Sequence, residues 1–130
     1  MVREEKLSLK QAECIKLKDI DTFAGSSIGE RIKRAYAYGG VKREQPFVFE
    51  YDRQLVQGVI DLYFIEDGQL VIVDYKTDRV LRGRAGEDEL RRRYSIQLDY
   101  YAMALSQITG LKVKEKVIYS FALGRSLTVE

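Results

Sequence analysis

Two aspartates stand in apolar stretches of the sequence, where a charged side chain is costly. Asp61 lies within the run 59–63, and Asp74 follows directly on Leu70–Val73. A carboxylate in such a place needs a cation or a hydrogen-bonding partner. Lys76 comes two residues after Asp74, so both side chains point to the same side of an extended strand. These three residues are the first candidates for a catalytic site.

The pair Asp67-Gly68 between the two aspartates is typical of a two-residue β-hairpin turn. Counted from that turn, the two strands align with Asp61 opposite Asp74. Facing carboxylates repel each other unless a cation lies between them. Two carboxylates and a main-chain carbonyl, such as that of Tyr75, can hold a hard divalent ion. We therefore expect a metal site that activates a water for attack on a phosphodiester, with Lys76 positioning the water or neutralising the phosphate.

The composition limits which metal this is. The 130 residues include one cysteine and no histidine. An internal disulfide, a cysteine cluster, histidine-bound zinc and histidine-dependent nucleophilic catalysis are therefore excluded within the chain. Oxygen ligands favour Mg²⁺, Mn²⁺ or Ca²⁺, and among these we expect Mg²⁺, with Mn²⁺ as a possible substitute. A net charge of +2 does not by itself indicate nucleic acid.

The spacing of apolar residues predicts the elements that position these side chains. We expect a helix over 28–36, three antiparallel strands over 43–51, 55–65 and 69–75, a helix over 88–109 and a strand over 113–121. Ser27 with Glu30 fits a capping box, and residues 79–89 resemble a mobile loop. The prediction is a loosely attached lead-in over 1–22 and one α/β domain over 23–130, with a central mixed sheet flanked by helices in the order α-β-β-β-α-β.

Further polar residues are expected near the site. Gln97 and Tyr101 share one face of the second helix, and Tyr94 lies three residues before Gln97. A glutamine on an otherwise apolar helix face needs a partner, so its amide, like the phenol of Tyr101, could hydrogen-bond a phosphate group or orient the lysine. Tyr94 is a further candidate for contact with a phosphate backbone, as are the arginines beside the site, which are Arg79, Arg82, Arg84, Arg91, Arg92 and Arg93.

Each of these residues also has a purely structural explanation. Asp61 and Asp74 could be charges at strand ends, with Lys76 as an ion-pair partner. The tyrosines of the second helix could be core residues, and residues 91–93 could belong to a solvated face with the acidic residues 87–89. Glu44, at the start of the first strand, could lie near the site or form an exposed ion pair.

Asp61 followed by Asp74-x-Lys76 resembles the PD-(D/E)xK nuclease signature. The segments 57–61, 73–78 and Tyr94-x2-Gln97-x3-Tyr101 resemble the RecB-type nuclease family. Segments 43–47 and 118–121 resemble the C-terminal nuclease domains of bacterial AddA helicase-nuclease subunits. The resemblance covers about residues 20–130. One feature departs from the family, which normally has a histidine ligand on an upstream helix, and this predicts weaker metal binding or slower cleavage.

The resemblance implies a restriction-endonuclease-like fold and a Mg²⁺-dependent DNA exonuclease that acts in double-strand-break repair and recombination. It also implies roles at the site for Gln97, Tyr101 and Glu44. We expect the chain to be a fragment of a larger bacterial, cytoplasmic helicase-nuclease whose partner is a second subunit and which makes no membrane contact. No P-loop motif is present, so the ATP-driven motor is expected outside this chain. The alternatives are a non-catalytic DNA-binding or assembly module with the same fold and a hydrolase of small nucleotides.

Overall fold

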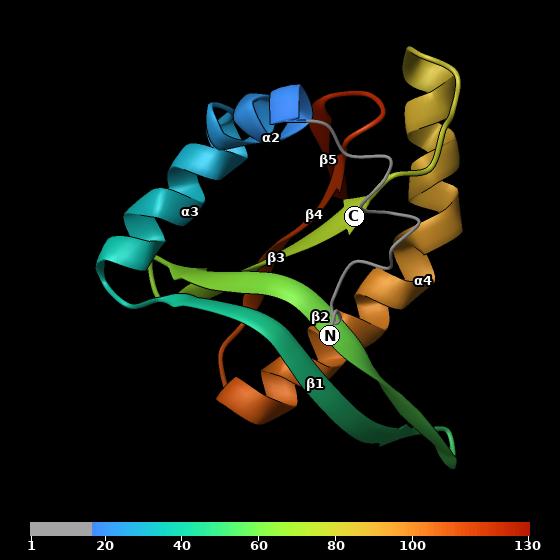
Figure 1. The fold of residues 1–130 in the computed structure, drawn as a ribbon. Helices are drawn as coiled ribbons and strands as arrows, with labels where there is room; N and C mark the ends of the chain where they lie inside the picture. The colour runs from blue at the N-terminus through green and yellow to red at the C-terminus, as the bar shows by residue number, and fades with distance from the viewer. Residues whose placement is uncertain (1–16) are drawn as a thin grey trace.

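One mixed sheet of five strands, in the spatial order β1-β2-β3-β4-β5, runs through the protein (Figure 1). The structure is a computed structural model that describes residues 17–130. The strands are β1 (Val41–Tyr51), β2 (Gln54–Glu66), β3 (Gln69–Lys76), β4 (Val113–Ser120) and β5 (Arg125–Val129). The helices are α2 (Leu17–Ala24), α3 (Ser27–Ala37) and α4 (Arg84–Thr109). The predicted α/β class, with a mixed sheet between helices, is confirmed.

The strands of the first half of the sheet are antiparallel, and one parallel pair follows. β1 pairs with β2 and β2 with β3 in antiparallel register, whereas β3 and β4 run parallel. A parallel pair needs a long crossover, which α4 provides. β5 then returns antiparallel to β4 and forms the second edge of the sheet.

The Asp67-Gly68 turn sets the predicted register of β2 and β3. Both residues have positive φ, 54° and 75°, as a tight two-residue hairpin turn requires. The pairs run from Glu66 with Gln69 to Leu62 with Val73. Asp61 and Asp74 are the next residues beyond the last pair, so the hairpin carries them to neighbouring positions.

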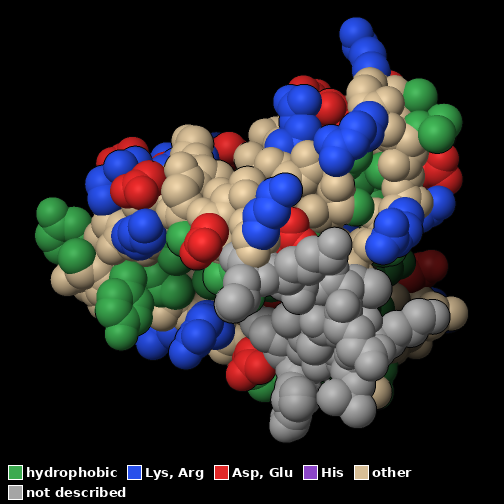
Figure 2. Space-filling model, turned by 45° about the horizontal axis from the view of Figure 1, so that its top comes forward, with side chains coloured by type: hydrophobic (Ala, Val, Ile, Leu, Met, Phe, Trp, Pro, Cys, Tyr) green, Lys and Arg blue, Asp and Glu red, His purple; other side chains and the backbone are tan. Residues whose placement is uncertain are grey.

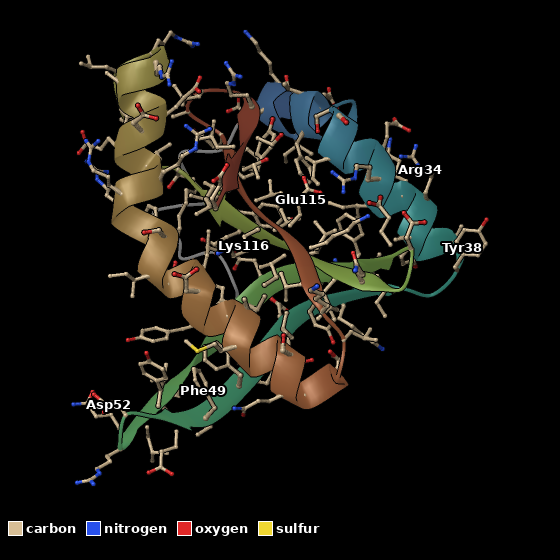
Figure 3. The ribbon with its side chains drawn as sticks, turned by 180° about the vertical axis from the view of Figure 1, so that it is seen from behind. Arg34, Tyr38, Phe49, Asp52, Glu115 and Lys116 are labelled. Atoms are coloured by element: carbon tan, nitrogen blue, oxygen red, sulfur yellow. The ribbon has the colours of Figure 1, made fainter. Side chains whose placement is uncertain are left out.

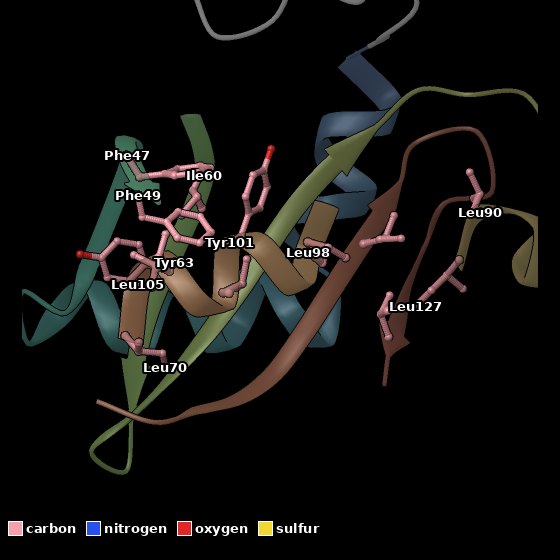
Figure 4. Packing of buried hydrophobic residues seen from close by; sticks show 14 residues of the cluster. Phe47, Phe49, Ile60, Tyr63, Leu70, Leu90, Leu98, Tyr101, Leu105 and Leu127 are labelled. Atoms are coloured by element: carbon pink, nitrogen blue, oxygen red, sulfur yellow. The ribbon is translucent and has the colours of Figure 1, made fainter. Parts of the chain in front are cut away.

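The two faces of the sheet carry separate hydrophobic clusters. On one face, α4 packs Leu98 into a cluster that includes Ile60 (Figure 4). On the other face, α3 packs Ile28 into a cluster that includes Leu62. Strand β3 lies between the two layers, and for this reason Leu70–Val73 are all fully buried.

The N-terminal helices differ from the prediction. A lead-in over 1–22 is wrong for residues 17–22, because they form most of α2, and Phe23 at its end packs 4.8 Å from the ring of Tyr119. Residues 1–16 lie outside the described residues. The N-cap of α3 is Ser26, whose hydroxyl accepts a hydrogen bond of 3.1 Å from the Gly29 N–H. The predicted capping box of Ser27 with Glu30 is therefore wrong, because the N-cap lies one residue earlier.

Two further differences lie in the second half of the chain. Helix α4 begins at Arg84, so the connection from β3 to α4 is residues 77–83, and of the loop predicted over 79–89 only residues 79–83 lie outside the helix. Strand β5 was not predicted, although Leu127 and Val129 alternate with polar residues and are buried. Gly110 ends α4 with a left-handed backbone, as expected. In the part of the chain that the structure describes, no helix is long and apolar enough to cross a membrane.

Candidate active site

The regular alternation of strand β2 breaks at Asp61. Ile60 packs beneath α4 and Leu62 packs beneath α3, although residues two apart on a regular strand share a face. On β1, Glu44 has a left-handed backbone (φ 52°) and lies between the two pairs that flank the break. The Asp61 carboxylate reaches β3, where its Oδ2 accepts a hydrogen bond of 2.8 Å from the Tyr75 N–H.

Asp74 is the most deeply buried charged residue of the described sheet. It is 2% exposed, and its Oδ2 has no hydrogen-bond partner among the described residues. Lys76 Nζ lies 3.0 Å from this oxygen and forms an ion pair with it. Burial raises the pKa of Asp74 well above its ordinary value; Lys76 opposes the rise and the neighbouring Asp61 adds to it. The carboxylate therefore lies where a further cation would stabilise it.

The Lys76 ammonium is enclosed by three groups. Besides Asp74, it donates a hydrogen bond of 3.2 Å to Gln97 Oε1 and lies 4.0 Å from the centre of the Tyr94 ring. Its side chain is 15% exposed. Gln97 and Tyr94 are three residues apart on α4, so one face of this helix forms the wall behind the lysine.

Behind Tyr94 lies a second set of polar contacts. The Tyr94 hydroxyl donates a hydrogen bond of 2.6 Å to Asp78 Oδ2, and Arg93 Nη1 donates one of 2.8 Å to the same oxygen. Arg93 also pairs with Glu89 at 2.8 Å. Burial raises the pKa of Tyr94 to about 12, and the hydrogen bond to Asp78 adds to the rise, so the hydroxyl is a neutral donor.

Tyr101 lies one helical turn beyond Gln97. It is 7% exposed, and its ring packs edge-on against Phe47 at 5.4 Å. Burial raises its pKa, and the charges of Asp74 and Asp61 add to the rise. Figure 4 shows its hydroxyl pointing away from the rest of the cluster.

The predicted site residues thus fall into two groups. Those brought together are Asp61, Asp74, Tyr75, Lys76, Tyr94, Gln97 and Tyr101. The second group lies on the surface. Arg79 and Arg82 are exposed on the connection from β3 to α4, Arg84 is exposed on the first turn of α4, and Glu44 is exposed on β1. Figure 2 shows Lys and Arg side chains interspersed with Asp and Glu on one face of the molecule.

Asp78 was not among the predicted site residues, and Arg93 was expected only at a phosphate contact or on a solvated face. A signal was available for Asp78, because it follows Lys76 by two residues on an extended segment. For Arg93 no local signal exists, since its partner is fifteen positions away in the sequence.

The donor set suits a hard divalent ion. No group of three His, Cys, Asp or Glu side chains that could hold a metal occurs in the described residues. The side-chain ligands available are the two carboxylates Asp61 and Asp74, and a main-chain carbonyl on β3 is the natural third oxygen. All of these ligands are oxygen atoms, and one of them, the buried Asp74 Oδ2, accepts no hydrogen bond from the described residues. Such a ligand set fits Mg²⁺ or Mn²⁺.

The model of the PD-(D/E)XK nuclease superfamily matches residues 15–127, almost the entire chain. The chain belongs to this superfamily. Its mixed sheet, with helices on both faces, is consistent with the restriction-endonuclease-like fold that the resemblance implied.

Relatives of the chain are large bacterial proteins. It is 39% identical to an ATP-dependent helicase/nuclease subunit of Thermoanaerobacter sp. (strain X514), over 98% of the chain and 11% of that protein. It is 33% identical to the subunit of the same name from Lachnoclostridium phytofermentans, over 100% of the chain and 12% of that protein. It is 39% identical to the subunit of the same name from Acetivibrio thermocellus, again over 98% of the chain and 11% of that protein. The chain thus spans about a ninth of the length of these relatives.

Proposed function

We propose that this chain is a metal-dependent deoxyribonuclease domain that hydrolyses phosphodiester bonds in DNA. The observation that carries the proposal is the buried Asp74 carboxylate, next to Asp61 and with the Lys76 ammonium 3.0 Å away. Such an arrangement costs folding free energy, and a fold retains it where the charges have a chemical use. Membership of the nuclease superfamily gives that use its reaction class.

Asp61, Asp74 and the main-chain carbonyl of Tyr75 would hold the ion, Mg²⁺ or in its place Mn²⁺. When bound, a divalent ion supplies a Lewis acid for the phosphoryl oxygen and a water of lowered pKa. Lys76 lies beside the carboxylates and stabilises the negative charge that develops on the phosphate. Gln97 holds the lysine in this position, and Tyr101 places a neutral hydroxyl near both aspartates.

We further propose that the domain works as an exonuclease within an ATP-dependent helicase/nuclease, as the names of its relatives suggest. The motor that consumes ATP and a second subunit would lie outside this chain, and the substrate would be DNA ends in double-strand-break repair and recombination in the bacterial cytoplasm. The exposed arginines at 79, 82 and 84 would contact the phosphate backbone beside the site, and Glu44 would be an accessory residue at its rim.

A second candidate is a non-catalytic DNA-binding or assembly module that keeps the nuclease fold. The observation in its favour is that the described residues offer only two side-chain carboxylates and no third side-chain ligand. Thermal denaturation with added Mn²⁺ separates the two. A catalytic site gains stability with metal, and the gain disappears in Asp61→Asn; a binding module gains none.

The deciding experiment is cleavage of labelled linear DNA by the whole protein in which this chain occurs. Asp74→Ala and Lys76→Ala should each lower Mg²⁺-dependent cleavage by about a hundredfold or more while any ATPase activity is kept. Glu30→Gln, on the exposed surface of α3, serves as the control and should cleave normally. Normal cleavage by either site variant would contradict the proposed function.

A further inference from the structure

The position of the Lys76 ammonium depends on a ring that has its own support. A lysine side chain is long and flexible, so an ammonium group needs contacts on several sides to stay in one place. Asp74 supplies an ion-pair partner, Gln97 supplies a hydrogen-bond acceptor, and the face of Tyr94 supplies the third contact, at 4.0 Å. The attraction of a cation to a ring depends on the cation lying over the ring face. The tilt of Tyr94 therefore matters for the lysine.

The tilt of Tyr94 is set at the other end of the ring. Its hydroxyl donates a hydrogen bond of 2.6 Å to Asp78 Oδ2, a short bond to a charged acceptor. Burial raises the pKa of Asp78, but the hydrogen bonds from Tyr94 and Arg93 outweigh burial, so its pKa lies below the ordinary value and the carboxylate stays charged. Arg93 Nη1 donates a second hydrogen bond, of 2.8 Å, to the same oxygen.

We propose that Asp78 is a positioning residue of the nuclease site, which holds the Tyr94 hydroxyl so that the ring face lies against the Lys76 ammonium. The inference rests on the proposed function, since Lys76 is its point of action. Asp78 touches neither the two aspartates nor the lysine in any described contact, so its effect passes through the tyrosine. Arg93 donates to the same oxygen of Asp78 and also pairs with Glu89, which contacts neither Asp78 nor Tyr94 in any described contact.

The test compares single-turnover cleavage of linear DNA by whole-protein variants. Asp78→Asn and Tyr94→Phe should each lower the cleavage rate about tenfold or more, because a misplaced catalytic group loses rate. The KM for DNA, taken from steady-state rates, should stay unchanged, since the Tyr94 hydroxyl donates to Asp78 in the structure and both variants keep the ring. The double variant should be no slower than either single variant, because both remove the same hydrogen bond.

Glu89→Gln is the matched control. It removes the other carboxylate partner of Arg93 and leaves the hydrogen bond between Tyr94 and Asp78 in place, so cleavage should stay within twofold of the parent. A structural readout accompanies the rates: in protein with ¹³C-labelled lysine, the ring current of Tyr94 should shift the ε-methylene protons of Lys76 upfield. That shift should shrink in Asp78→Asn and persist in Glu89→Gln.

Failure of this inference and failure of the proposed function look different. If the parent protein cleaves DNA, Asp74→Ala does not, and Asp78→Asn cleaves at the parent rate, the positioning role is overturned and the nuclease remains. An additive double variant, or a raised KM with an unchanged rate, overturns the positioning role as well. If the parent protein cleaves no DNA in Mg²⁺ or Mn²⁺, both proposals fall together.

Discussion

The Oδ2 atom of Asp61 accepts a hydrogen bond of 2.8 Å from the main-chain N–H of Tyr75. This bond crosses from β2 to β3 just beyond the last regular pair, Leu62 with Val73. It therefore gives Asp61 a structural role besides the chemical role that we propose for it, because the side chain accepts a hydrogen bond from β3 beyond the last regular strand pair. Variants of Asp61 can distinguish the two roles.

Asp61→Asn should keep the protein at least as stable as the parent in the absence of metal. The amide oxygen still accepts from Tyr75, and the negative charge beside the buried Asp74 is removed. Asp61→Ala removes the same charge but also the acceptor of the Tyr75 N–H, so its free energy of unfolding should be about 1 kcal/mol lower than that of Asp61→Asn. Thermal denaturation in a chelating buffer measures both. Equal stability of the two variants would show that the hydrogen bond contributes nothing.

The ion pairs of Arg31 make stability depend on acid pH. Its guanidinium joins Glu66 on β2 at 2.7 Å and Glu115 on β4 at 2.6 Å, and Figure 3 labels Glu115 on its strand. The hydrogen bond from Arg31 is the largest cause that lowers the pKa of Glu66 to about 2, from an ordinary value of 4.5. A carboxyl group whose pKa is lower in the folded state than in the unfolded state stabilises the protein at pH values above its unfolded-state pKa. That contribution is complete above pH 4.5 and is lost as the pH falls toward 2.

In Glu66→Gln the free energy of unfolding should therefore fall less steeply between pH 4.5 and 2 than in the parent. At neutral pH it should be lower than that of the parent by about 1 kcal/mol and no more, since solvent screens partly exposed ion pairs. Urea denaturation at several pH values measures this. Glu30→Gln is the control, because Glu30 pairs with Lys33 at 3.4 Å between side chains that are more than half exposed. If the free energy of unfolding depends on acid pH in Glu66→Gln as it does in the parent, the ion pair between Arg31 and Glu66 contributes nothing to stability.

The sequence was informative where local rules decide the structure. The Asp67-Gly68 turn and the period of two were enough to predict the register that brings Asp61 to Asp74. Helix α2 and strand β5 escaped prediction because they are short, and packing against distant residues stabilises them, as the contact of Phe23 with Tyr119 shows.

The same limit applies within the site. The break at Asp61 and the left-handed Glu44 depend on three strands together, and no local pattern announces them. Asp78 had a local signal, since it lies two residues after Lys76. Its role could not be inferred without its partner Tyr94, because this contact depends on how α4 packs on the sheet.

Tyr119→Phe should stabilise the protein. Tyr119 is fully buried, and its hydroxyl has no hydrogen-bond partner among the described residues. A buried polar group without a partner loses its hydration and gains no hydrogen bond, so its removal should raise the free energy of unfolding by about 1 kcal/mol. Tyr36→Phe removes a hydroxyl from a side chain that is 75% exposed and should change nothing measurable. Destabilisation by Tyr119→Phe would reveal a partner for this hydroxyl.

Gly86→Ala should destabilise the protein, although alanine normally favours a helix. A Cβ at Gly86 would collide with the main-chain oxygen of Leu81 and come within 3.1 Å of Val80 Cγ2. A main-chain oxygen cannot rotate aside, so the connection from β3 must move off the first turn of α4. Alanine gains about 1 kcal/mol of helix propensity over glycine, whereas overpacking costs about 1–3 kcal/mol and often more where backbone must shift.

The collision should therefore outweigh the propensity, and the net loss should appear as a lower midpoint in urea. Ala85→Ser, at an exposed neighbouring position, should cost no more than about 0.5 kcal/mol. Because the displaced connection also carries Asp78, Gly86→Ala should slow cleavage more than Ala85→Ser does. A gain in stability would show that the segment 77–83 is not held against the helix, and it would remove the rigid support that the position of Asp78 requires.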